Sequence, residues 1–99
     1  MKQFKVKLIE AAHNDLIDAR AWYHEQNPSL PKRFTQQIKV TIEHLASLPT
    51  VHAIRYRDVR IAQIAVFPYA IHYFIEYDTI IIIAVHHNAI NPTKWDKRL

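Results

Sequence analysis

The most informative part of this 99-residue sequence is VFPYAIHYFIEYD, at residues 66–78. Apolar residues alternate along it as they do in a β-strand, yet Pro68 stands near its start. A proline has no N–H to donate to a neighbouring strand, so it is excluded from a central ladder. We therefore predict that one strand ends before Pro68 and that the next begins after it. The alternative is a bulge inside one long, bent strand.

The same alternation continues on both sides of this stretch and predicts four consecutive strands, near residues 52–57, 60–67, 70–77 and 79–87. Residues 57–59 and 77–79 have the composition of short reversals. Residues 79–85 are almost all apolar and β-branched, and such a strand would promote aggregation at a sheet edge. We expect it to lie inside the sheet with both faces covered.

An earlier strand and two helices precede these four strands. The alternation of residues 4–8 predicts the strand, and helical spacing follows in two segments. The first segment ends at Asn27-Pro28, because a residue before proline avoids the helical conformation. The second begins with Ser29 as its N-cap and stops at Pro49. Its apolar stripe comprises Phe34, Ile38, Ile42, Leu45 and Leu48.

This order of elements predicts the fold class. The connection between the helices is short, which implies an antiparallel hairpin. We predict a single α+β domain over residues 1–99: an N-terminal strand, an α-helical hairpin, and an antiparallel β-meander with both helices packed on one face of the sheet.

Composition excludes several classes of function. The chain has no cysteine, hence no disulfide framework and no thiolate metal site, and it has no glycine, which rules out glycine-rich phosphate loops and dinucleotide fingerprints. Its N-terminus lacks the apolar core of a signal peptide, and its longest apolar run, residues 80–85, is far too short to span a bilayer. We expect a cytoplasmic protein without a cofactor, a membrane partner or a small-molecule substrate.

Charge indicates the kind of partner. The formal net charge is +4, and residues 10–25 hold four carboxylates against Arg20 alone, so the cationic excess lies elsewhere in the chain. A basic surface favours an anionic partner, whether nucleic acid or an acidic protein segment. The alternative is that this charge only keeps a small domain dispersed in water.

A possible RNA-cleaving centre lies among four residues. Arg55 and Arg57 are two apart, so in a strand they would face the same way, and Arg60 could join them across the hairpin. Cations of this kind could stabilise a phosphorane, and His87 could act as an acid or base near neutral pH. The alternative is that these arginines are solvated and hinder edge pairing. His86 and His87 are neighbours and should face opposite ways in a strand, so we expect no metal site there.

The C-terminal segment offers a candidate partner-binding patch. Trp95 lies among Lys94, Lys97 and Arg98, and exposed Trp and Arg side chains are common at the energetic centres of interfaces. The alternative is that Trp95 folds back and anchors the tail. Together with Tyr69, the residues Trp95, Lys94 and Arg98 are the predicted partner-binding set.

Taken together, these residues resemble the RelE/ParE superfamily, the toxins of bacterial type II toxin–antitoxin modules, also called plasmid-stabilisation proteins. The resemblance covers nearly the whole chain. It rests on Ala12 to Tyr23, Leu45 to Pro49, Arg60 upstream of Phe67-Pro68-Tyr69, Ile71, Tyr73 and His87, and Asn91-Pro92 with Trp95 and Arg98. It implies a cognate antitoxin as partner and supports a functional role for Arg60.

The resemblance leaves the target open. Many members have an arginine where this sequence has Ile90, and losing that charge favours a ParE-like toxin that inhibits growth through DNA gyrase and is not an enzyme. The alternative is a RelE-like, metal-independent endoribonuclease that cuts mRNA on the ribosome, with Arg55, Arg57, Arg60 and His87 as its catalytic residues. A second alternative is an interaction domain without toxicity.

Overall fold

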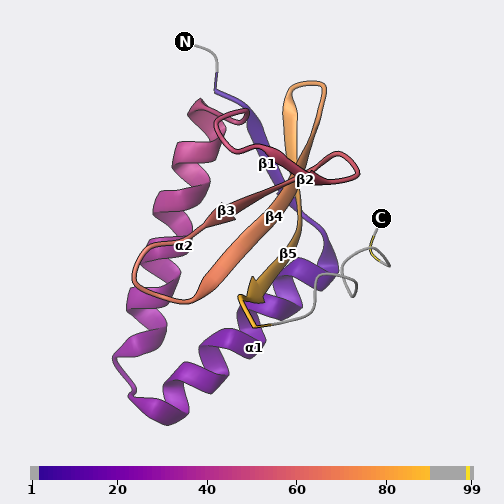
Figure 1. The fold of residues 1–99 in the computed structure, drawn as a ribbon. Coiled ribbons are helices and arrows are strands. Elements are labelled where there is room, and N and C mark those ends of the chain that lie inside the picture. The colour runs from indigo at the N-terminus through magenta and orange to yellow at the C-terminus, as the bar shows by residue number, and fades with distance from the viewer. Residues whose placement is uncertain (1–2, 90–97, 99) are drawn as a thin grey trace.

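The helices and strands follow one another in the predicted order (Figure 1). The structure is a computed structural model that describes residues 3–89 and Arg98. Its elements are β1 (Lys5–Leu8), α1 (Glu10–Gln26), α2 (Leu30–Ser47), β2 (Ile54–Tyr56), β3 (Val59–Gln63), β4 (Tyr69–Glu76) and β5 (Thr79–His87). Neither helix is long and apolar enough to cross a membrane, as far as the described residues go.

The strands form one sheet in the order β1-β5-β4-β3-β2. β1 runs parallel to β5, from the pair Lys5–Thr79 to the pair Leu8–Ile82, and the other neighbours are antiparallel. Both helices cross the same side of the sheet (Figure 1). The α+β fold class is therefore confirmed, and so is the position of residues 79–85 inside the sheet, since β5 lies between β1 and β4.

The main core fills the space between the helices and the sheet. Burying one large apolar side chain contributes about 1.5–3 kcal/mol, and the side chains of Phe34, Leu45 and Tyr73 are almost completely buried here. At one end of this core, four aromatic rings have centroids 5.0–5.9 Å apart, those of Tyr23, Phe34, Phe67 and Tyr69. Leu48 was expected in this core but is 47% exposed, because α2 ends at Ser47 and Leu48 turns outward as its C-cap.

Ser29 occupies the predicted N-cap position of α2 but does not cap it through its side chain. Its hydroxyl instead donates to the Asn27 side-chain oxygen at 2.9 Å, and its backbone N–H donates to the same oxygen at 3.0 Å. The short connection between the helices is thus stabilised by a polar turn around Asn27.

The break at Pro68 is confirmed, because β3 ends at Gln63 and β4 begins at Tyr69. Two tight turns follow each other there: the Phe67 N–H donates to the Ala65 carbonyl at 2.9 Å, and the Tyr69 N–H donates to the Phe67 carbonyl at 2.8 Å. The predicted strand over 60–67 was too long. Ile64 and Phe67 are nevertheless buried, at 3% and 7% exposure, so this turn contributes two apolar side chains to the core.

Candidate functional site

The arginines of β2 and β3 do not form the expected common face. β2 ends at Tyr56, and Arg57 lies in the turn with a φ of 46°, so strand alternation does not reach it. Ile54 is opposite Arg60 and Tyr56 is opposite Val59, which leaves Arg55 as the extra residue of a bulge. The expectation that Arg60 joins the other two arginines across the hairpin is therefore wrong.

Arg60 instead binds the connection between α2 and β2. Its guanidinium donates to the backbone carbonyl of His52 at 2.6 Å and to that of Thr50 at 3.5 Å. The buried hydroxyl of Tyr73, directly opposite Arg60 on β4, donates to the Pro49 carbonyl at 2.7 Å. Two neighbouring side chains thus satisfy carbonyls of an irregular segment, which would otherwise cost free energy where they are shielded from water.

His87 lies at the other end of the sheet, opposite Tyr69. The imidazole packs edge-on against the Tyr69 ring with centroids 5.3 Å apart, and its Nδ1 accepts the backbone N–H of Ala89 at 3.0 Å. Arg60 is opposite Tyr73, four residues further along β4. With about 3.3 Å per residue and two strand spacings of about 4.8 Å, the Cα atoms of Arg60 and His87 are roughly 16 Å apart.

Arg98 binds the edge of β5 beyond the end of β1. The ladder between the two strands stops where the Ile9 N–H donates to the Ile82 carbonyl at 3.1 Å. Past this point the Arg98 guanidinium donates to the Ile83 carbonyl at 2.9 Å, and the Asp15 carboxylate accepts the Val85 N–H at 3.0 Å. Arg98 and Asp15 also pair with each other, at 2.6 and 3.1 Å. Lys94 and Trp95, the other predicted members of the tail patch, lie outside the described residues.

Asp15 is the charged residue that the sequence reasoning missed. Burial raises the pKa of its carboxyl, but hydrogen bonds from His86, Arg98 and the Val85 N–H outweigh burial and lower that pKa to about 2. The helix dipole gives no signal for Asp15, because this residue lies beyond the first turn of α1. A better signal is position: Asp15 is three residues after Ala12 and four before Ala19, both buried, so it lies on the buried stripe of α1.

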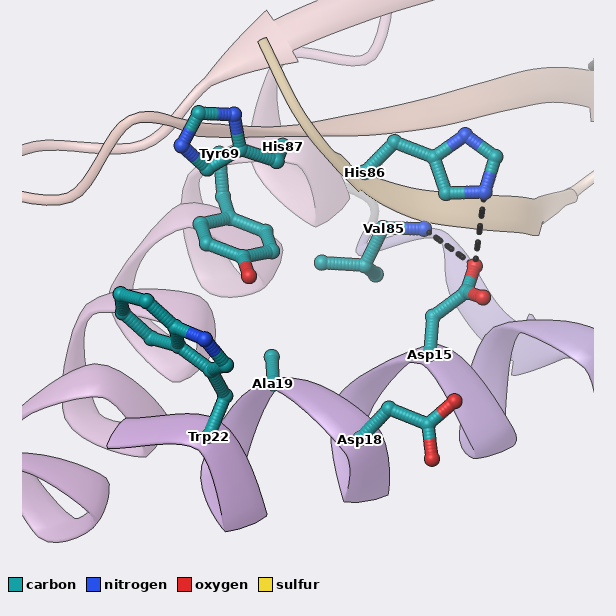
Figure 2. Close-up of a pocket in the computed structure, with 8 residues that line it drawn as sticks. All are labelled: Asp15, Asp18, Ala19, Trp22, Tyr69, Val85, His86 and His87. Carbon is teal, nitrogen blue, oxygen red and sulfur yellow. Dashed lines mark hydrogen bonds and ion pairs between the residues drawn. The ribbon is translucent and has the colours of Figure 1, made fainter. Parts of the chain in front are cut away.

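The second face of the sheet, opposite the helices, carries a row of buried polar side chains. His86 Nε2 is 3.4 Å from Asp15 Oδ2 (Figure 2), and the rings of His86 and His72 have centroids 5.9 Å apart. His72 Nδ1 is in turn 3.2 Å from the Tyr56 hydroxyl. Burial, followed by the nearby charge of His86, lowers the pKa of His72 to about 4, so its imidazole is neutral at pH 7. The described residues contain no group of three or more His, Cys, Asp or Glu that could hold a metal ion.

A pocket of about 300 Å³ opens between α1 and the ends of β4 and β5 (Figure 2). We call it the α1 pocket. It brings together two predicted residues, Tyr69 and His87, with α1 side chains that the sequence reasoning did not select. Its lining comprises Asp15, Asp18, Ala19, Trp22, Tyr69, Val85, His86 and His87.

Comparisons with known proteins place this chain in a family. Residues 6–92 match the family model described as the ParE toxin of the type II toxin–antitoxin system parDE. The solved structure titled "Chromosomal ParDE TA system from P. aeruginosa" has a chain similar in fold, with a TM-score of 0.75 and 18% identity over 86% of this chain and 96% of that chain. No curated protein matches significantly in sequence. With the family model covering most of its length, the chain belongs to the ParE toxin family of type II toxin–antitoxin systems, whose membership implies an antitoxin partner.

Proposed function

We propose that this chain inhibits growth by acting on DNA gyrase in the cytoplasm, and that its cognate antitoxin neutralises it by binding it directly. Membership of the ParE toxin family supports this function. The +4 net charge suits an antitoxin with an acidic segment.

The choice of DNA gyrase over mRNA as the target rests on the position of Arg60. RNA cleavage would need its guanidinium beside a proton-transferring group and a phosphate. The guanidinium donates instead to the carbonyls of His52 and Thr50, and the Arg60 backbone is roughly 16 Å from that of His87, by strand spacing. This arrangement supports a protein that acts by binding rather than by a chemical step of its own.

Purified chain added to DNA gyrase, relaxed plasmid and ATP tests the proposal. We expect loss of supercoiling or accumulation of cleaved plasmid, while a cell-free translation reaction keeps its mRNA intact. In cells, expression should cause filamentation and a DNA-damage response. Ribosome-dependent cuts in mRNA with normal supercoiling would establish the nuclease instead. If neither supercoiling nor mRNA were affected, the chain would be an interaction domain without toxicity.

Neutralisation is tested separately by isothermal titration of the chain with the product of the adjacent reading frame. We expect sub-micromolar affinity and restored supercoiling on addition of that protein. A titration without heat, together with unchanged inhibition of gyrase, would contradict the antitoxin part of the proposal alone.

A further inference from the structure

The α1 pocket has the shape and lining of a site for one long side chain. Its volume of about 300 Å³ is at the small end of ligand pockets. The side chains of Ala19 and Val85 are almost completely buried at its base, at 3% and 2% exposure. Trp22 and Tyr69 contribute aromatic rings from α1 and β4, and Figure 2 shows the Trp22 indole leaning toward the Tyr69 hydroxyl.

Trp22 is unusual because it remains more than half exposed, at 56%. Its indole packs edge-on against Tyr23 with centroids 5.1 Å apart, which fixes one side of the ring and leaves the pocket side open. An exposed Trp beside an apolar base is a typical anchor for a partner protein.

The charge of the pocket is negative, although the chain as a whole carries +4. Arg98 already neutralises Asp15 at 2.6 Å. Asp18 is exposed, three residues further along α1, and within residues 3–89 and Arg98 it makes no hydrogen bond or ion pair. Asp18 and Trp22 are four residues apart, so their backbones lie on the same face of α1. Figure 2 shows the Asp18 carboxylate turned away from the Trp22 indole, so pairing with a cation on that ring requires a change of the Asp18 rotamer.

We propose that the α1 pocket binds an arginine side chain of the antitoxin, with the guanidinium on the Trp22 indole and paired with the Asp18 carboxylate. A planar guanidinium stacks on an aromatic ring and pairs with a carboxylate in two places at once, which an ammonium cannot do. The carbon stem of the arginine lies over Ala19 and Val85. This inference rests on the proposed function, because it takes the antitoxin as the occupant.

The assignment to an arginine of the antitoxin follows from charge. Attraction between a basic toxin and an acidic segment brings the two together without fixing their register. A cation held in the acidic α1 pocket fixes that register, because it ties one residue of the partner to one place on this chain. A nucleic-acid backbone does not suit this pocket, since the Asp18 carboxylate would repel its phosphates.

A double-mutant cycle tests the pairing. Asp18→Asn and Trp22→Leu should each weaken the complex with the antitoxin about fivefold to thirtyfold, whereas Glu25→Gln, which removes a charge from α1 outside the pocket, should leave the affinity unchanged. Each antitoxin arginine is then replaced by glutamine, and for one of them the loss of affinity should disappear in the Asp18→Asn background. Equal affinities for all three toxin variants, or no arginine coupled to Asp18, would overturn the proposal.

A second measurement separates this proposal from the proposed function. N-acetyl-arginine methylamide is titrated into the chain while the indole N–H signal of Trp22 is followed by NMR, with the uncharged citrulline analogue as control. Only the arginine compound should move the signal, whether or not an antitoxin binds. If both compounds or neither move it, the pocket does not recognise guanidinium. If the signal moves only after Lys94 and Lys97 are both replaced by alanine, the pocket serves the chain's own tail and the antitoxin is not its occupant.

Discussion

The side chain of Asp15 provides a hydrogen-bond partner for a backbone N–H at the edge of β5. Its carboxylate accepts the Val85 N–H, which β1 would have bound had it continued past Leu8. At the same edge, the Arg98 guanidinium donates to the Ile83 carbonyl. Two charged groups that also neutralise each other therefore cover the edge of β5. Exposed strand edges promote pairing with other chains, so this cover disfavours such pairing at β5.

His72 makes the stability of the protein depend on pH. Its pKa is about 4 in the folded protein and 6.5 in an unfolded chain, so the unfolded state binds more protons between these values. The free energy of unfolding should be unaffected by this group above about pH 6.5 and should fall as the pH drops to about 4, by roughly 3 kcal/mol in all. Urea unfolding of the wild type and of His72→Gln across this range measures the effect.

The His72→Gln variant should show a much weaker dependence of its free energy of unfolding on pH. His24→Gln is the matched control, because His24 is exposed at the end of α1, and it should keep the wild-type slope. The Asp15 carboxyl has a pKa of about 2, so its contribution to the pH dependence of stability falls below the pH range in which His72 titrates. Identical slopes for wild type and His72→Gln would rule His72 out as the titrating group.

At the scale of elements, the connection between α2 and β2 depends on Arg60 rather than on its own sequence. Arg60→Gln should lower the free energy of unfolding by about 1–2 kcal/mol, because the loop carbonyls lose a charged donor in a partly exposed position. Hydrogen exchange of residues 50–53 should accelerate in the variant. Arg55→Gln, an exposed arginine in the neighbouring strand, should change neither quantity. Equal stability of the two variants would contradict the structural role of Arg60.

Sequence patterns predicted long elements better than short ones. β4 and β5 agree with prediction to within one residue, because each is a run of eight or more residues rich in β-branched and aromatic side chains. β2 and β3 are shorter than predicted, since turn residues such as Ile64 and Phe67 are buried for tertiary reasons that periodicity does not encode. The candidate site was predicted only in part. Tyr69 and His87 were predicted for two different roles and line the same pocket. Asp15 and Trp22 join them through packing between elements far apart in sequence.

At the scale of the whole molecule, the parallel pairing of β1 with β5 closes the fold. The Lys5 N–H donates to the carbonyl of Asp78, just before β5, and the Ile9 N–H donates to that of Ile82 within it, so strand alternation turns the Lys7 N–H toward β5 as well. Lys7→Pro should remove that donor, expose the β-branched edge of residues 79–82 and cause aggregation. The carbonyl left without a donor costs about 1–3 kcal/mol.

Gel filtration and thioflavin fluorescence measure this outcome. Lys7→Thr is the control, because it removes the same side chain and keeps the N–H, and it should remain monomeric. A Lys7→Pro variant that elutes as a stable monomer would show that β1 is dispensable for protecting the sheet.

The position of β5 has a consequence for how this protein is made. It is the last of the five strands to be translated, yet β1 and β4 both pair with it and α1 contacts it. While the chain is still growing, β1 has no strand to pair with and α1 can pack only on α2, and contacts between distant parts of a chain are slow to form. The sheet can therefore close only once β5 has left the ribosome, and a partner that recognises the α1 pocket has no complete site to bind before then, because Val85, His86 and His87 of β5 form part of its lining.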